Sequence, residues 1–289
     1  MRYRFIDQYR RVWLVVIMCQ VLQVSRSCFY DWCRKPLSLQ AKRRLALMVK
    51  IKAVHRQSKQ IYGSPRIHDA LCDQGERCSQ NTVATIMRKN SIKSSIKRKF
   101  KATTNSNHGY PVADNILNRN FQQTQVNQVW ASDITYIPTR EGWLYLAIVI
   151  DLYSRKIVGW AMSSRIKSQL VIDALEMAVT QRCPGRGLLH HSDRGSQYAC
   201  KDYQQHLKRH GMICSMSRKG NCYDNAPTES VFGTIKTEWI NRQDYLTRQQ
   251  GKQSVFEYIA CFYNCQRKHS SLGYMSPMDF EAAANVAVV

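Results

Sequence analysis

The segment from residue 128 to residue 269 alternates between strand-like and helix-like patterns, and this restricts the possible folds more than any other feature. The runs "QVWASDITYIPT" and "WLYLAIVIDLYSRKIVGWAMS" gather β-branched and aromatic residues between turn signals, which predicts three strands in an antiparallel meander. "SQLVIDALEMAVTQR" predicts a helix opened by Ser168, and "GLLHHSDRGSQY" a short buried strand. "CKDYQQHLKRHG" predicts a helix stopped by Gly211, and "MICSMS" a fifth strand. Two more helical segments follow, from about Thr228 to Ile240 and over 247–269.

Three antiparallel strands followed by a helix, a strand, a helix and a strand predict an α/β fold with a mixed five-stranded sheet of the ribonuclease-H-like type and flanking helices. We assign this core and its C-terminal helical extension to residues 126–289. Residues 101–125 are rich in Asn, Gln and Thr with little periodicity, so we expect a linker there.

This strand order predicts that three carboxylates lie near one another. Asp133 lies in the first strand, which such a sheet places at its centre, and Asp193 lies at the carboxyl end of the neighbouring fourth strand. Glu229 lies in the first turn of the helix expected to cross behind them. Three converging carboxylates repel one another unless cations neutralise them, and oxygen ligands suit magnesium or manganese. The sequence therefore predicts a site for two Mg²⁺ ions, with Mn²⁺ as a substitute, that supports displacement at phosphorus.

Other acidic residues are weaker candidates for metal ligands. Asp151 ends the second strand at a hairpin, where Asp is a common turn residue. Asp224 precedes the helix of Glu229 and is interpreted as a cap or a partner of the ligands. Glu238 follows Glu229 by nine positions, which turns it to the opposite helix face at about 100° per residue. Asp173 is interpreted as a solvated residue in mid-helix.

Positive charge is concentrated in the first third of the chain. The formal net charge is +23, and residues 1–110 carry 23 Lys and Arg against 5 Asp and Glu, which indicates a polyanionic partner. The stretch "QVLQVSRSCFYDWCRK", with Ser25 as a helix cap, is typical of a helix-turn-helix within residues 1–36. A second unit within 37–100 has a helix over Pro65–Asp73, a break at Gly75 and a helix from Ser79 to about Lys89. Ordinary helical hairpins with solvated basic faces are the alternative, whereas DNA binding predicts contacts from Arg26 and Arg66.

The cysteines and one apolar run do not favour disulfides, a structural zinc or a membrane span. The eleven cysteines are scattered and lack finger spacing, so the sequence favours a reduced cytosolic setting without disulfides or a structural zinc. The run from Val12 to Val24 is shorter than the roughly 20 residues of a membrane span. We interpret it as a buried helix and expect no membrane partner.

Several sequence motifs together resemble one family of enzymes. The gap of 35 residues between Asp193 and Glu229 is the signature spacing of the DDE transposase and retroviral integrase superfamily. "YGSPRIH", "WASDITYI", "HSDRGSQY", "NAPTESVFGTIKTE" and "YNCQRKHSSLGYMSP" resemble the second-frame (OrfB-type) catalytic transposase of bacterial insertion sequences of the IS-three family, over nearly the whole chain. The cysteines at 200, 222 and 265 are not part of the family pattern.

This resemblance implies an integrase-type catalytic core, Mg²⁺ dependence, and binding to the terminal inverted repeats of the element and to target DNA. It also implies a copy-out, paste-in pathway through a circular intermediate. Family members usually act as a fusion with an upstream-frame product, so this chain is expected to work with such a partner and as a homo-oligomer on DNA, in the bacterial cytoplasm at the nucleoid. Lys236 matches the family's basic residue seven positions after the Glu, on the same helix face.

The expected reaction is cleavage of one strand at an element end by water, followed by attack of the freed 3′-OH on a second phosphodiester, with no covalent protein intermediate. Arg194, Arg218 and Lys219 are the predicted phosphate contacts beside the site, although such basic residues can equally be solvated. Two alternatives stay open: a hydrolytic nuclease on the same fold, and a DNA-binding regulator of transposition.

Overall fold

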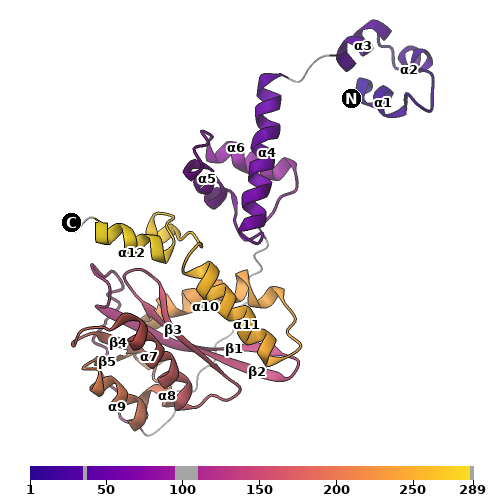
Figure 1. Ribbon diagram of the computed structural model, residues 1–289. Coiled ribbons are helices and arrows are strands. Elements are labelled where there is room, and N and C mark those ends of the chain that lie inside the picture. The colour runs from indigo at the N-terminus through magenta and orange to yellow at the C-terminus, as the bar shows by residue number, and fades with distance from the viewer. Residues whose placement is uncertain (35–37, 95–109, 220, 287–289) are drawn as a thin grey trace.

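Five strands form one mixed sheet in the order β3–β2–β1–β4–β5 (Figure 1). The strands are β1 (Val129–Thr139), β2 (Gly142–Asp151), β3 (Ile157–Ser163), β4 (Leu189–Ser192) and β5 (Ile213–Met216). The computed structural model describes residues 1–34, 38–94, 110–219 and 221–286. The first three strands pair antiparallel, and β4 and β5 extend the sheet in parallel from β1. The ribonuclease-H-like order predicted from the sequence is confirmed, with β1 at the centre.

The parallel pairs require crossover helices, because their strands run in the same direction. Helix α7 (Ser168–Arg182) connects β3 with β4, and the short α8 (Ser196–Ala199) and α9 (Lys201–Arg209) connect β4 with β5. Helix α7 begins at Ser168 as predicted, but the sequence pattern did not anticipate α8. These crossovers place the first residue after β4 beside the middle of β1.

The two faces of the sheet bury different residues of β1. Trp130 and Ile134 belong to the core cluster that includes α7, α8 and α9, whereas Ala131 and Ile137 pack with α10 (Ala226–Glu238) on the other face. Successive strand residues point to opposite faces, so Asp133 shares a face with Ala131 and therefore with α10. Helix α11 (Arg248–Glu257) and the π-helical η3 (Tyr258–Tyr263) also cover this face. The predicted helix over 247–269 is thus shorter than expected and includes a π-helical segment.

The C-terminal helix α12 (Pro277–Val286), which follows the 3₁₀ turn η4 (Ser270–Leu272), was not anticipated from the sequence. Its Glu281 accepts hydrogen bonds from both terminal nitrogens of Arg182 at 2.9 Å, from Lys156 Nζ at 3.0 Å and from Ser154 Oγ at 2.7 Å. Burial alone would raise the pKa of Glu281, but Arg182 and the hydroxyl of Ser154 lower it. The last helix is therefore held by charge to α7 and to the β2–β3 turn.

Helices α4 (Leu39–Gln57), α5 (Ser64–Asp73) and α6 (Gln80–Lys89) form the predicted second helical unit. Ser79 caps α6 by accepting a hydrogen bond from the Thr82 N–H, and Gly75 breaks the chain with a φ of 80°. Both positions match the sequence prediction, whereas α4 was not foreseen. The unit contacts the core directly, because Tyr62 donates a hydrogen bond to the carbonyl of Gln266 and Lys268 pairs with Asp69 and Asp73.

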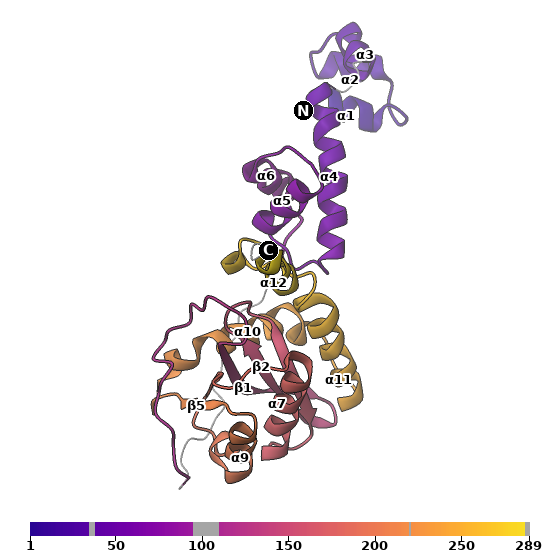
Figure 2. The ribbon, with the colours of Figure 1, turned by 60° about the vertical axis from the view of Figure 1, so that its left-hand side comes forward.

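Helices α1 (Arg2–Tyr9), α2 (Val15–Val21) and α3 (Arg26–Arg34) surround a small core of Ile6, Met18, Cys19 and Phe29. They lie at the end of α4 that is remote from the sheet (Figure 2). Ser25 caps α3 as predicted, since its Oγ accepts a hydrogen bond from the Cys28 N–H at 3.5 Å.

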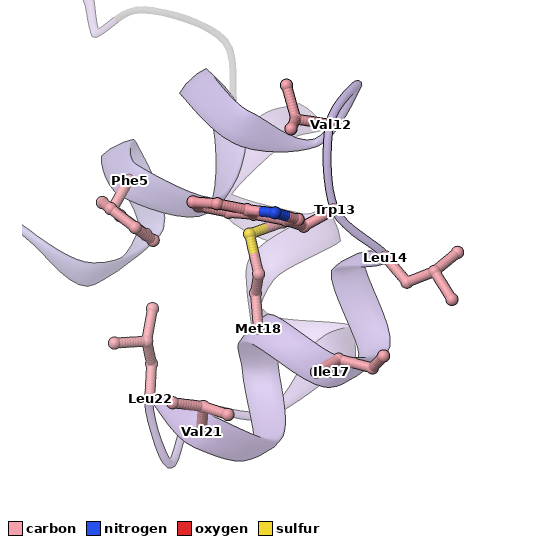
Figure 3. A pocket seen from close by; sticks show the side chains of 8 residues that line it. All are labelled: Phe5, Val12, Trp13, Leu14, Ile17, Met18, Val21 and Leu22. Carbon is pink, nitrogen blue, oxygen red and sulfur yellow. The ribbon is translucent and has the colours of Figure 1, made fainter.

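The prediction that Val12–Val24 forms a buried helix is wrong. Helix α2 covers only part of that run, and its outer side chains, with those of the turn before it, line an open apolar groove (Figure 3). Trp13 is 52% exposed, Leu14 70% and Val21 75%. Three short helices provide too few neighbours to cover so many apolar side chains, and only Met18 and Cys19 of this run are buried.

Among the described helices none has both the length and the apolar character needed to cross a membrane.

Candidate active site at three carboxylates

Asp133 occupies the fifth position of β1, opposite Ile148 of β2. The strand forms there because β-branched and aromatic residues surround the aspartate on both sides. Asp133 Oδ1 accepts a hydrogen bond from the N–H of Ile134 at 2.7 Å, which fixes the carboxylate beside its own strand. The side chain is half-buried on the α10 face of the sheet.

Asp193 is the first residue after β4, the strand that pairs with β1. Its Oδ1 accepts a hydrogen bond from the Gly195 N–H at 2.8 Å, and this closes the turn into α8. A Cβ at position 195 would lie 3.0 Å from that oxygen, so glycine allows the turn to approach the carboxylate closely. Glu229, half-buried in the first turn of α10, comes from a third segment of the chain.

The pKa of Asp133 reflects its neighbours. Burial raises this pKa well above its ordinary value, and the negative charge of Asp193 raises it further. The Ile134 N–H and Lys236 act in the opposite direction, whereas Glu229 adds to the increase. Burial also raises the pKa of Glu229. The structure thus brings the three predicted carboxylates into one electrostatic neighbourhood that disfavours negative charge.

The three carboxylates are more widely spaced than the ligands of a single closed ion site. In the described part of the chain, the only trio whose ligand atoms all lie within 4.8 Å of one another is Glu176, His206 and His210, elsewhere in the fold. Two-metal sites hold their ions about 3.5–4 Å apart, so carboxylates that serve different ions need not converge on one point.

Lys236 lies two helical turns after Glu229, with its Nζ 4.5 Å from the centre of the Tyr136 ring. Burial lowers the pKa of this lysine, and the nearby Asp133 carboxylate counters that effect. The cation is therefore held near the carboxylates by an aromatic ring of β1, which the helical spacing alone did not reveal.

Two of the predicted phosphate contacts beside the site have partners within the protein. Arg194 Nε donates to the carbonyl of Ser217 at 2.5 Å, and Arg218 donates to Asp224 at 2.9 Å. Lys219 is exposed. Arg194 thus links the turn after β4 with the loop after β5, and Arg218 ties that loop to Asp224, so both arginines shape this edge of the site.

Asp224 has more partners than the helix cap or partner of the metal ligands expected from the sequence. Its side chain is fully buried and accepts hydrogen bonds from Arg218, from Arg119 at 2.8 Å and from Asn115 at 2.9 Å. These ion pairs, led by Arg218, lower the pKa of Asp224. The cluster joins residues 115–119 to the loop before α10. No short-range pattern could reveal it, because Arg119 and Asp224 are 105 positions apart.

The remaining acidic residues have structural partners. Asp151 is buried and accepts hydrogen bonds from the N–H groups of Asn127 and Tyr153, as expected of a turn residue. Glu238 faces away from Glu229, as predicted, and pairs with the buried Arg267 at 2.7 Å. Asp173 is exposed.

Two histidines of β4 form a buried polar layer next to the site. No pattern in the sequence indicated this layer. His190 contacts the hydroxyls of Ser132 at 2.8 Å and Tyr203 at 3.0 Å, and His191 contacts Ser215 at 2.9 Å. Burial lowers the pKa of His190 to about 3 and that of His191 to about 4, so both are neutral. They tie the end of β4, and hence Asp193, to the adjoining strands.

The predicted contacts in the helical regions differ in their surroundings. Arg26 begins α3 and is exposed. Arg66 in α5 pairs with Glu238 at 3.3 Å and lies over the Tyr62 ring, so its guanidinium faces the core. All cysteines whose side chains are described are free.

Comparison with known families finds an integrase core domain over residues 123–222, a second integrase core model over 229–284, and an HTH-like domain over 42–100. The transposase InsF for insertion sequence IS3A of Escherichia coli (strain K12) is 43% identical over 283 residues, which cover 97% of this chain and 98% of that relative. The insertion element IS600 uncharacterized 31 kDa protein of Shigella sonnei is 44% identical over 91% of this chain and 97% of its own length.

Solved structures give weaker similarities. A chain of the simian T-cell lymphotropic virus intasome, in complex with PP2A regulatory subunit B56 gamma, matches 80% of this chain and 74% of its own length with 13% identity and a TM-score of 0.47. The HTLV-2 integrase catalytic core domain in complex with magnesium matches 54% of this chain and 96% of its own length with 14% identity and a TM-score of 0.43.

Proposed function

The chain carries integrase core and HTH-like domains and belongs to the family of InsF-type transposases of insertion sequence IS3, and from that premise we propose that it cuts and joins DNA strands at the ends of a mobile element. The observation that supports the chemistry is the placement of Asp133, Asp193 and Glu229 from a central strand, its parallel neighbour and a helix. Strand transfer by a polynucleotidyl transferase needs such a cluster and no protein nucleophile.

The donor set fits divalent metal ions. All three proposed ligands are carboxylates, which favour Mg²⁺ and accept Mn²⁺. The raised pKa of Asp133, caused by burial and by Asp193, means that the ionised site is unfavourable without a nearby cation. A bound pair of Mg²⁺ ions would activate the attacking oxygen and stabilise the leaving oxygen at phosphorus.

The protein's own groups position the reaction. We assign Asp133, Asp193 and Glu229 as the metal ligands and Lys236, held over Tyr136, as the cation that pairs a DNA phosphate beside them. Arg194, Arg218, Lys219, Arg26 and Arg66 are retained as proposed DNA contacts. Among these, Arg26 and Lys219 are exposed, whereas Arg66 must release Glu238 in order to reach DNA.

The proposed partners are double-stranded DNA of the terminal inverted repeats and of the target. Helices α4–α6, within the HTH-like domain, and the exposed Arg26 on α3 are the elements proposed to dock on the duplex. Residues 1–36 and 37–100 would act as DNA-binding regions, 101–125 as the connection, and 126–289 as the catalytic core. We further propose assembly of several copies on DNA, cooperation with an upstream-frame product, and action in the bacterial cytoplasm at the nucleoid.

Converting Glu229→Gln tests the proposal directly. We expect strand transfer in Mg²⁺ to be lost while binding to terminal DNA is retained, because the side chain keeps its size but loses its charge. Asp173→Asn, an exposed carboxylate on α7, is the matched control and should leave both properties unchanged. Full strand transfer by Glu229→Gln would refute the assignment.

The same assay separates the alternatives. Pre-cut element ends are incubated with target DNA, and the products are resolved on a denaturing gel. A strand transferase yields joined products, a hydrolytic nuclease yields only shorter fragments, and a regulator without catalysis leaves the DNA intact. Either of the last two results would overturn the proposed function.

A further inference from the structure

A cluster of two histidines and a glutamate lies between two helices of the layer opposite α10. His206 in α9 and His210, which caps the end of α9, are four residues apart and therefore share one helix face. Glu176 faces them from α7. Its Oε1 lies 2.6 Å from His206 Nδ1 and 3.1 Å from His210 Nε2.

The geometry points to a binding site for a borderline transition-metal ion, with zinc as the expected occupant, formed by Glu176, His206 and His210. One ligand atom from each residue lies within 4.8 Å of the other two. Tetrahedral zinc with bonds of about 2.0–2.2 Å keeps neighbouring ligand atoms about 3.3–3.6 Å apart. Small side-chain rotations are therefore enough to admit the ion.

The ligand types select this class of metal. Two imidazole nitrogens and one carboxylate suit Zn²⁺, Co²⁺ or Ni²⁺, whereas Mg²⁺ prefers oxygen ligands alone. Two histidines four residues apart on a helix form a recurrent zinc-binding pair. Burial would raise the pKa of Glu176, but hydrogen bonds from His210 and His206 outweigh it and lower that pKa.

The cluster is accessible. The side chain of Glu176 is 40% exposed, that of His206 24% and that of His210 28%, so an ion can enter from solvent and a water can occupy a fourth position. In the metal-free state the three groups satisfy one another by hydrogen bonding. Binding would require each imidazole to carry its proton on the ring nitrogen that faces away from the metal.

This site is separate from the proposed catalytic carboxylates. Helices α7 and α9 cover the sheet face that buries Trp130 and Ile134, whereas Asp133 faces α10 on the other side. An ion at Glu176 would join α7 to α9 across the surface of their shared core. Its expected role is to stabilise this helical layer, which supports the β4 end from which Asp193 projects.

Zinc titration of the full chain, after removal of metals with EDTA, tests the inference. Calorimetry should show uptake at this site, and a zinc excess of about 100-fold over Kd should raise Tm by several degrees. His206→Gln and Glu176→Gln, which retain hydrogen-bonding groups, should lower the affinity of the site by at least about 100-fold, since loss of a mere outer partner costs about 10–100-fold. Circular dichroism establishes that each variant is folded.

Two controls exclude other zinc sites. His55→Gln removes a histidine of α4 outside the cluster, and Asp133→Asn removes a catalytic carboxylate; both should retain the zinc-induced rise in Tm. Co²⁺ should give an absorption spectrum without the intense sulfur charge-transfer bands of cysteine ligation. Equal zinc affinity and an equal Tm shift in the wild type and in folded His206→Gln would overturn the inference.

Discussion

At the scale of single residues, the surroundings of Asp133 disfavour the ionised form of its carboxylate. Its raised pKa, due first to burial and then to Asp193, means that its ionised form destabilises the metal-free fold at neutral pH. The proposed metal-binding role of Asp133 and the stability of the metal-free fold therefore make opposite demands at this position.

We accordingly expect Asp133→Asn to increase the free energy of unfolding by about 1 kcal/mol or more when measured by urea titration in EDTA. Mg²⁺ should stabilise the wild type more than the variant, because only the wild type offers the full set of ligands. A variant that is less stable than the wild type in EDTA would contradict the electrostatic argument.

His269 gives a prediction about acid stability. It is buried and accepts a hydrogen bond from Arg267 at 3.1 Å, and its pKa is lowered to about 2, first by burial and then by Arg267. The unfolded chain binds a proton at this histidine below pH about 6.5, whereas the folded chain does not. The stability contributed by the neutral histidine is therefore complete above that pH and is lost as the pH falls below it.

Replacing His269→Gln should remove one such proton from the unfolding equilibrium. Between pH 6.5 and pH 5 we expect the wild type to lose about 2 kcal/mol more of its unfolding free energy than the variant does. Denaturant unfolding curves at the two pH values provide the measurement, and parallel losses in the two proteins would count against a buried neutral histidine.

At the scale of elements, the contact between β3 and α7 depends on a glycine. A Cβ at Gly159 would lie 2.2 Å from the carbonyl oxygen of Ala174 and 2.7 Å from the Cβ of Ala178. The helix thus rests directly on the strand backbone, and any side chain at this position would push the two elements apart.

Gly159→Ala should therefore destabilise the protein by about 1–3 kcal/mol, as expected of overpacking in a close-packed core. The matched control is Gly185→Ala in the loop before β4, where nothing lies within 4 Å of the added methyl group and φ is not positive. Thermal unfolding of both variants decides the point, and similar Tm values would mean that α7 can shift without cost.

The helices and strands also show which elements local sequence patterns could predict and which they could not. The strands and α7 followed from clustered β-branched residues and from apolar periodicity, because these patterns can be read within short stretches of the sequence. Helix α4 was missed because exposed Leu45 and Val49 obscure the periodic buried positions Leu47, Ile51 and Val54. The groove of α2 was mistaken for core because a sequence shows that residues are apolar but does not show whether neighbours are numerous enough to cover them.

The residues of the candidate site also fall into those that local sequence patterns could indicate and those that they could not. Asp133, Asp193 and Glu229 could be proposed as metal ligands from the sequence because strand order and helix position predict that they lie near one another. The ion cluster around Asp224 and the buried histidines before Asp193 were not, since their partners lie in distant segments. Groups that support the candidate site depend on tertiary contacts, whereas the proposed metal ligands are marked by residue type and spacing.

At the scale of the whole molecule, the charge distribution predicts how DNA binding responds to salt. The net charge is +23, and the first 110 residues hold most of the excess. Lys and Arg that neutralise phosphates release counterions, so affinity falls with a slope of about −0.9 per phosphate contact in a plot of log K against log salt.

If the protein makes 6–10 such contacts, as in typical complexes, affinity for terminal DNA should fall by about 10³–10⁵ between 50 and 200 mM salt. Replacing the exposed pair Lys52→Gln and Arg56→Gln on α4 should reduce the magnitude of the slope by up to about 2. Fluorescence anisotropy across a salt series measures both quantities, and an unchanged slope would place the duplex away from α4.

The hydrogen bonds accepted by Glu281 have a consequence for the order in which the protein folds during translation. Its partners Ser154, Lys156 and Arg182 precede it by 127, 125 and 99 positions. On the ribosome, the basic helices emerge before the sheet and α10, and the helix that locks the β2–β3 turn to α7 emerges after all of them. A nascent chain can therefore present helices α1–α6 before the sheet is locked, and a stop codon a few residues before Glu281 would leave the sheet, α7 and α10 complete but without this lock.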